Sequence, residues 1–156
     1  MKTKEYITVD KSTWADGPWQ TEPDKVQYED WETKLPCLIV RNAFGALCGY
    51  VGVSEGHPAY KKEYYDLDYE VHGGLTFSDF CLENPTEESG ICHVPEEEEP
   101  EKVWWLGFGC GHCYDAMPHP DCQMGAFQDG SYRNISYVRN QIGHLAQQVK
   151  EKANEA

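Results

Sequence analysis

The sequence contains no apolar run of the ~18 residues needed to cross a membrane, and its N-terminus lacks the apolar core of a signal peptide. We therefore expect a cytoplasmic protein with no membrane partner. Basic residues are also scarce, since 13 Lys and Arg stand against 27 Asp and Glu and give a formal net charge of −14. Affinity for phosphate backbones comes mainly from Lys and Arg, so no nucleic-acid partner is expected.

The seven cysteines cannot all pair with one another, because their number is odd. Together with the expected cytoplasmic location, this predicts free, reduced thiols. The sequence does have enough apolar material for a core, because 40% of its 156 residues are hydrophobic and 13% are aromatic. We interpret residues 1–156 as a single domain, with an N-terminal arm over 1–34 and a core over 35–149.

Several segments have the pattern of strands. Residues 35–41 and 46–53 are apolar, and the loop between them has the length of a hairpin connection. Residues 67–72 alternate apolar and polar side chains, which indicates a half-buried strand, and residues 102–109 are interpreted as a further strand. In the arm, residues 24–33 are interpreted as a short helix.

Apolar residues near the C-terminus recur at spacings of four, three and four, which places them on one face of a helix. These residues are Val138, Ile142, Leu145 and Val149. Asn134 or Ser136 can cap the start of this helix. The strands and the helix together predict an α+β fold, in which a small, mostly antiparallel sheet is covered on one face by the C-terminal helix.

Several short motifs occur in order along the chain: Cys-Gly-Tyr-Val-Gly-Val at 48–53, Gly-His-Pro at 56–58, His-Gly-Gly-Leu-Thr at 72–76, and a Trp-Trp segment at 104–115. In these motifs, and in the Tyr-Val pair at 137–138, the chain resembles an uncharacterised family found in bacteriophage and bacterial genomes. The resemblance implies a phage-type protein of the host cytoplasm with an anti-defence or host-takeover role. It implies no known reaction.

The last of these segments departs from the family pattern at one position. The family carries Trp-Trp-x-Gly-Phe-Asp-x-x-His-x-x-Asp, and here Gly109 stands in place of the first Asp, whereas His112 and Asp115 are kept. The departure removes one carboxylate from the polar set. Cys110 or Cys113 is a candidate to replace that carboxylate as a ligand.

Polar side chains gather where the predicted strand at 102–109 ends, and residues at such strand ends are placed to form pockets. His112 and Asp115 follow this strand, and His72 ends the predicted strand at 67–72. We expect these three residues to converge on one pocket as catalytic groups, with an imidazole as base and a carboxylate that orients it. Gly-rich turns expose backbone N–H groups that can hold an anion. The ligand-binding candidates are His57, Gly73, Gly74, Gly109 and Gly111.

The turn after residue 109 also offers a set of metal ligands. Zn²⁺ accepts S, N and O donors, and with three protein ligands it keeps a position for an activated water. The candidate ligands are Cys110, His112, Cys113 and Asp115. The alternatives are thiols packed as small apolar side chains, or a redox-active Cys-x-x-Cys pair, for which the flanking glycines make a poor helix start. Zn²⁺ is the one cofactor expected; otherwise there is none.

Two classes of function fit these residues. The first is a small hydrolase, with or without metal assistance, that acts on a nucleotide-like small molecule. The second is a non-catalytic binding protein that sequesters a nucleotide signal or inhibits a host protein. Polar residues clustered at a strand end favour the hydrolase, whereas the missing carboxylate at Gly109 favours the binding protein.

Overall fold

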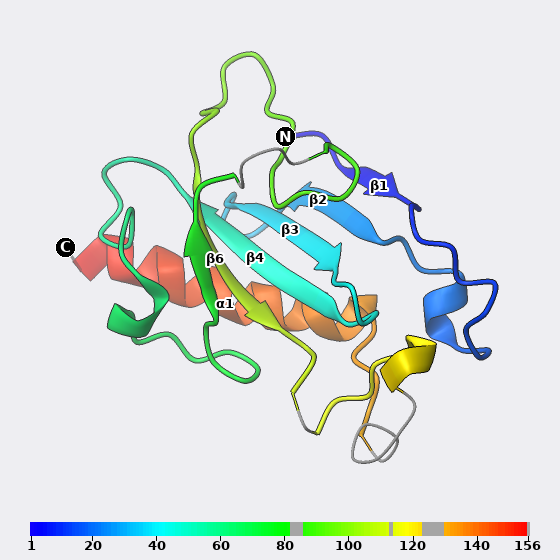
Figure 1. Cartoon of the computed structure of the whole chain (residues 1–156). Helices are drawn as coiled ribbons and strands as arrows, with labels where there is room; N and C mark the ends of the chain where they lie inside the picture. The colour runs from blue at the N-terminus through cyan, green and yellow to red at the C-terminus, as the bar shows by residue number, and fades with distance from the viewer. Residues whose placement is uncertain (82–85, 113, 123–129, 156) are drawn as a thin grey trace.

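The computed structural model describes residues 1–81, 86–112, 114–122 and 130–155, and within these residues six strands form one open sheet (Figure 1). The strand order is β1-β2-β3-β4-β6-β5, and neighbouring strands are antiparallel. The strands are β1 (Lys4–Tyr6), β2 (Lys25–Glu29), β3 (Pro36–Arg41), β4 (Leu47–Val53), β5 (Phe77–Asp79) and β6 (Trp104–Gly109). The helix is α1 (Ile135–Glu155), and short 3₁₀ turns cover Pro18–Gln20, Tyr64–Asp66 and Pro120–Cys122. The predicted α+β fold, the hairpin and the strand before Cys110 are confirmed.

One face of the sheet is covered by α1, which crosses behind β4 and β3 (Figure 1). The predicted apolar stripe of the helix is fully buried at Val138, Ile142, Leu145 and Val149. Gly49 in β4 allows the close approach, because a Cβ at this position would lie 2.9 Å from Ile142 Cγ1. Asn134 caps the helix, since its Oδ1 accepts a 2.9 Å hydrogen bond from the backbone N–H of Tyr137.

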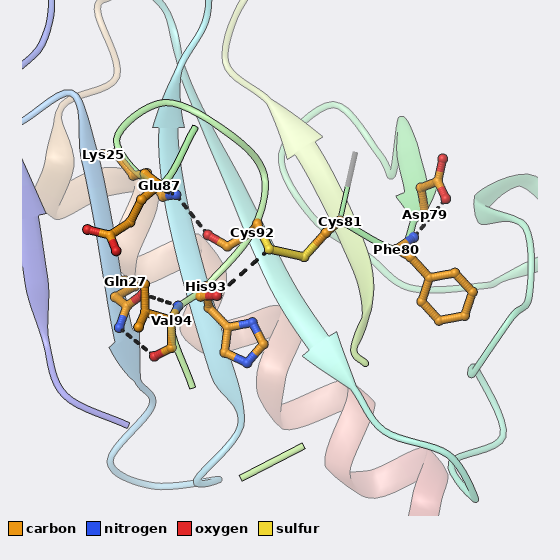
Figure 2. The surroundings of a disulfide bond; sticks show 9 residues. All are labelled: Lys25, Gln27, Asp79, Phe80, Cys81, Glu87, Cys92, His93 and Val94. Atoms are coloured by element: carbon orange, nitrogen blue, oxygen red, sulfur yellow. Dashed lines mark hydrogen bonds between the residues drawn. A yellow bond between two sulfur atoms is a disulfide. The ribbon is translucent and has the colours of Figure 1, made fainter. Parts of the chain in front are cut away.

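The other face is covered by residues 86–100, which we call the strap, and not by a helix (Figure 2). Lys25 and Gln27 project from β2 toward the strap and are almost fully buried. Lys25 Nζ donates to the backbone carbonyls of Glu87 and Cys92, and the side-chain amide of Gln27 exchanges hydrogen bonds with the backbone of Val94. The buried side chains of β2 therefore form hydrogen bonds with backbone groups of the strap, which has no regular secondary structure to satisfy them.

A disulfide between Cys81 and Cys92 ties the strap to the chain that follows β5 (Figure 2). The prediction of free thiols is therefore wrong for this pair. An odd number of cysteines excludes complete pairing and does not exclude one bond. The free thiols among the described residues are Cys37, Cys48, Cys110 and Cys122.

Two of the predicted elements are wrong. Residues 24–33 hold β2 in place of a helix, because Val26 and Tyr28 pack toward α1 while Lys25 and Gln27 are covered by the strap. Strands β1 and β2 thus bring part of the predicted N-terminal arm into the sheet.

Residues 67–72 belong to no strand and lead into a turn at His72. Their backbone runs along α1, where the N–H groups of Glu70 and His72 donate to the side-chain oxygens of Gln148 and Gln141. The alternation of buried and exposed side chains holds from Leu67 to Val71 and fails at His72, whose side chain is only 5% exposed, and glutamine side chains replace a neighbouring strand as hydrogen-bond partners. No helix in the described part of the chain is long and apolar enough to span a membrane.

Candidate functional site

Asp115 lies at the centre of a buried hydrogen-bond network just after β6. Its Oδ2 accepts hydrogen bonds from His72 Nε2 at 2.9 Å and from the backbone N–H of His112 at 3.0 Å. Its Oδ1 accepts from Arg133 Nε at 2.9 Å, and the carboxylate is fully buried. The structure thus brings together His72, His112 and Asp115, which are separated by about forty residues of chain.

The carboxyl group of Asp115 is held in its ionised form. Burial raises the pKa of Asp115, but hydrogen bonds from His72, Arg133 and the backbone of His112 outweigh this effect and lower the pKa below its usual value. The same contact with Asp115 raises the pKa of Arg133. A buried carboxylate with a guanidinium on one oxygen and an imidazole on the other is therefore a stable arrangement.

His72 connects this carboxylate to α1. Its Nδ1 lies 2.6 Å from the hydroxyl of Tyr137, and its Nε2 faces Asp115. Because an ionised carboxylate can only accept, Nε2 carries a proton; in the neutral tautomer of the ring, Nδ1 then accepts the hydrogen of the Tyr137 hydroxyl. The four side chains of Arg133, Asp115, His72 and Tyr137 form one continuous chain of hydrogen-bonded groups, with Arg133 also stacked on the Tyr137 ring at 4.8 Å.

Gly73 and Gly74 shape the chain beside His72. Both have left-handed backbone conformations, with φ of 68° and 79°, which glycine adopts without strain. The N–H of Gly74 donates to the carbonyl of Val71 at 2.8 Å and closes a turn. A Cβ at Gly73 would collide with the imidazole of His112, so this glycine is required for the two histidines to approach.

His112 packs beside the network rather than inside it. Its ring centroid lies 5.9 Å from that of His72, and its ring stacks on Tyr114 at 5.7 Å. Its Nε2 is buried and has no hydrogen-bond partner within the described residues. A buried ring nitrogen without a partner among these residues is unusual, and here Nε2 packs against Gly73.

The zinc hypothesis receives no support from the described residues, among which no group of three or more His, Cys, Asp or Glu could hold a metal ion. Cys113, one of the four candidate ligands, lies outside them. Cys110 is buried, and burial raises the pKa of its thiol, which disfavours the thiolate that Zn²⁺ needs. Both oxygens of Asp115 already accept hydrogen bonds from protein donors. Zinc binding stays an untested prediction.

Of the other ligand-binding candidates, His57 lies apart from the network, whereas Gly111 directly precedes His112 in the chain. His57 donates from Nε2 to the carbonyl of Val149 and accepts at Nδ1 from the N–H of Ala59. About 18 Å of helix separates Val149 from Tyr137. Gly111 is exposed on the turn before His112.

Gly109, where the family pattern has Asp, ends β6. Among the described residues, a Cβ there would meet Cys48 Sγ alone, at 3.6 Å, so these residues leave room for a side chain. The alternation of β6 places position 109 on the face of Trp105, opposite the face of Cys110 and α1. A carboxylate at 109 would therefore point away from the His72 network.

Two members of the network, Arg133 and Tyr137, were not predicted from the sequence. Arg133 lies in a segment without regular secondary structure, where the sequence has no helix or strand periodicity. Tyr137 belongs to a polar row with Gln141 and Gln148, which flanks the apolar stripe of α1 at spacings of four and seven. All three contact residues 70–72, so a polar row beside an apolar stripe was the available signal.

Comparisons of this chain with protein-family models, with curated proteins and with solved structures give no match. Its function must therefore be argued from the geometry alone.

Proposed function

We propose that the protein is a small hydrolase that acts on a nucleotide-like small molecule and moves protons between Tyr137 and His72, with Asp115 stabilising the imidazole of His72. The observation that supports this proposal is the hydrogen bond of 2.6 Å between His72 Nδ1 and the Tyr137 hydroxyl, on the side of the imidazole opposite Asp115. An imidazole fixed by a carboxylate on one nitrogen and by a hydroxyl on the other is arranged for general acid–base chemistry.

In the proposed reaction, the Tyr137 oxygen exchanges protons with the substrate. As a water oxygen bonds to the phosphorus or glycosidic carbon, the Tyr137 oxygen takes one of its protons and passes its own to His72 Nδ1. Asp115 stabilises the resulting imidazolium. When the bond to the leaving atom breaks, which is an oxygen of the phosphoester or a nitrogen of the base, the proton returns from His72 through Tyr137 to that atom. Each group ends in its starting state.

Two further side chains favour an anionic, ring-containing substrate. The Arg133 side chain is a quarter exposed, and its guanidinium lies over the Tyr137 ring, so a positive charge borders the reacting hydroxyl. Tyr114 is 48% exposed and stacks on His112, which offers a flat aromatic surface. A nucleotide could place its phosphate beside Arg133 and its base beside Tyr114. The proposed proton transfers involve no metal ion.

The second candidate is a binding protein without catalysis, in the anti-defence or host-takeover role that the resemblance implies. The observation in its favour is the completeness of the network, because both oxygens of Asp115 are satisfied and the His72 side chain is only 5% exposed. A buried network in which every polar group has a hydrogen-bond partner can serve to stabilise the fold without any catalytic role. A cytoplasmic location belongs to both candidates.

The test is incubation of the purified protein with a panel of nucleotides and cyclic nucleotides, followed by mass spectrometry of products and of retained ligand. Tyr137→Phe removes only the hydroxyl, and Tyr65→Phe, at a ring 70% exposed, is the matched control. We expect turnover by the wild type and by Tyr65→Phe, and a loss of about 100-fold or more in Tyr137→Phe. Retained ligand without product supports the binding protein. An unchanged rate in Tyr137→Phe contradicts the proposed mechanism.

A further inference from the structure

His72 ends a segment that has no neighbouring strand, so the backbone of this segment depends on side chains of α1 for hydrogen bonds. Gln148 forms two hydrogen bonds with the backbone of Glu70, donating to its carbonyl and accepting from its N–H, each at 2.7 Å. At His72, the backbone N–H donates to Gln141 Oε1 at 3.0 Å. The helix thus supplies partners that a neighbouring strand supplies elsewhere in the sheet.

Gln141 and Tyr137 hold two different parts of His72. They lie four residues apart on α1, which places them one turn apart on the same face of the helix. The Tyr137 hydroxyl lies 2.6 Å from Nδ1 of the imidazole, whereas Gln141 bonds to the backbone N–H of the same residue. The ring and the backbone of His72 are therefore bonded to adjacent turns of one helix.

The residues that follow His72 restrain its backbone less. Gly73 and Gly74 come next, and both have a left-handed φ. Their turn is closed by the hydrogen bond from the N–H of Gly74 to the carbonyl of Val71. Because glycine restricts the backbone least of all residues, the hydrogen bond to Gln141 supplies a restraint that these two residues do not.

The position of the backbone decides whether the ring can reach both of its partners. Nε2 lies 2.9 Å from Asp115 and Nδ1 lies 2.6 Å from the Tyr137 hydroxyl, on different sides of a rigid ring. If the backbone shifts, the ring cannot keep both contacts in line, and hydrogen bonds weaken steeply when they are misaligned. Bonds to an ionised group are the stronger ones, so the bond to Tyr137 is the one expected to weaken.

We propose that Gln141 is a positioning residue, which holds the backbone of His72 so that Nδ1 meets the Tyr137 hydroxyl. This role rests on the proposed function, because the alignment matters for a reaction only if a proton passes between Tyr137 and His72. Gln141 acts through His72 and is assigned no contact with the substrate.

The test is ¹⁵N NMR of the His72 ring in the full-length protein without substrate, combined with turnover of the panel of nucleotides and cyclic nucleotides. Gln141→Met keeps the length of the side chain and removes the acceptor. We expect its Nδ1 resonance to move toward that of Tyr137→Phe, and turnover to fall about five-fold, as the loss of one hydrogen bond predicts. Gln141→Glu retains an acceptor oxygen and should restore the wild-type Nδ1 resonance.

Gln148→Met is the matched control, because it removes hydrogen bonds between the same helix and the same segment, at Glu70 and not at His72. It should lower the midpoint of thermal unfolding at least as much as Gln141→Met and leave the Nδ1 resonance unchanged. If Gln141→Met does not fold, Gln141→Asn withdraws the acceptor by one methylene while the side chain stays polar, and it takes the same place in the comparison.

Three results would overturn the proposal: an Nδ1 resonance in Gln141→Met that equals the wild type, an equal change in Gln148→Met, or a Gln141→Glu variant that behaves like Gln141→Met. The resonance is measured without substrate, so it tests Gln141 separately from the hydrolase. Turnover that is unchanged in Tyr137→Phe would contradict the hydrolase, whereas the Nδ1 resonance would still decide whether Gln141 positions His72.

Discussion

The two faces of the sheet are covered by different means. On one face, α1 buries a continuous apolar stripe that includes Ile142 and Leu145. On the other, the strap has no helix or strand, and Lys25 and Gln27 bind its backbone groups while a disulfide ties it down (Figure 2). The helix satisfies its own backbone and needs only apolar contact, whereas an irregular segment depends on partners from elsewhere in the chain.

The largest effect is expected on the helix-covered face. Leu145→Asp places an unpaired carboxylate in a fully buried position and should lower the free energy of unfolding by about 5 kcal/mol. Asn140→Asp, at an exposed position of the same helix, is the control and should change it by less than about 0.5 kcal/mol. Thermal or urea unfolding followed by circular dichroism measures both. An unchanged midpoint in Leu145→Asp would mean that α1 is not docked on the sheet.

A smaller effect is expected from the disulfide of the strap. Replacing Cys81 and Cys92 by serine removes a cross-link of sequence separation 11, which should cost about 3 kcal/mol in the chain-entropy account. The same loss should appear when the wild type is reduced, and the double variant should not respond to reductant. Thiol titration in denaturant should find at most five of the seven thiols before reduction. Seven free thiols before reduction would show that the disulfide between Cys81 and Cys92 does not form.

Lys25→Met should have the smallest effect of the three, about 2 kcal/mol, because the carbonyls of Glu87 and Cys92 lose their buried donor. Lys62→Met, at an exposed lysine, is the control. The pH dependence gives a second readout. Burial lowers the pKa of Lys25 to about 8, so between this value and its usual 10.5 the unfolded chain binds the proton and the folded protein does not.

Stability contributed by this titration therefore rises with pH through that window and is absent below it. Subtracting the Lys25→Met curve from the wild-type curve isolates the contribution of Lys25 from other groups that titrate there. A difference that does not increase between pH 8 and 10.5 would show that the ammonium is not desolvated under the strap.

The difference between the two faces of the sheet also determines which parts of the fold could be predicted from the sequence. The stripe of α1 and the β3–β4 hairpin follow from local patterns, so both were found. The strand β2 was missed because Lys25 and Gln27 are buried by a strap some sixty residues further along the chain. The segment at 67–72 was predicted to be a strand because alternating apolar and polar residues indicate which side chains are buried. The alternation does not indicate that the backbone bonds to glutamine side chains and not to a neighbouring strand.

For the site, the sequence supplied His72, His112 and Asp115 from residue type and from the glycines beside them, and the structure places these residues together. It did not supply Tyr137 or Arg133, whose chemistry is defined only once α1 docks beside residue 72. The part proposed for Tyr137 depends on the tautomer of His72, which no sequence pattern encodes.

The most direct test of the proposed proton path is the protonation of the His72 ring, measured by ¹⁵N NMR at neutral pH in the wild type, Tyr137→Phe and Tyr65→Phe. We predict a proton on Nε2, facing Asp115, and an Nδ1 resonance typical of a hydrogen-bond acceptor that changes in Tyr137→Phe and not in Tyr65→Phe. A proton on Nδ1 would rule out the proposed proton path, because Tyr137 would then accept from His72 and could not pass its own proton to it.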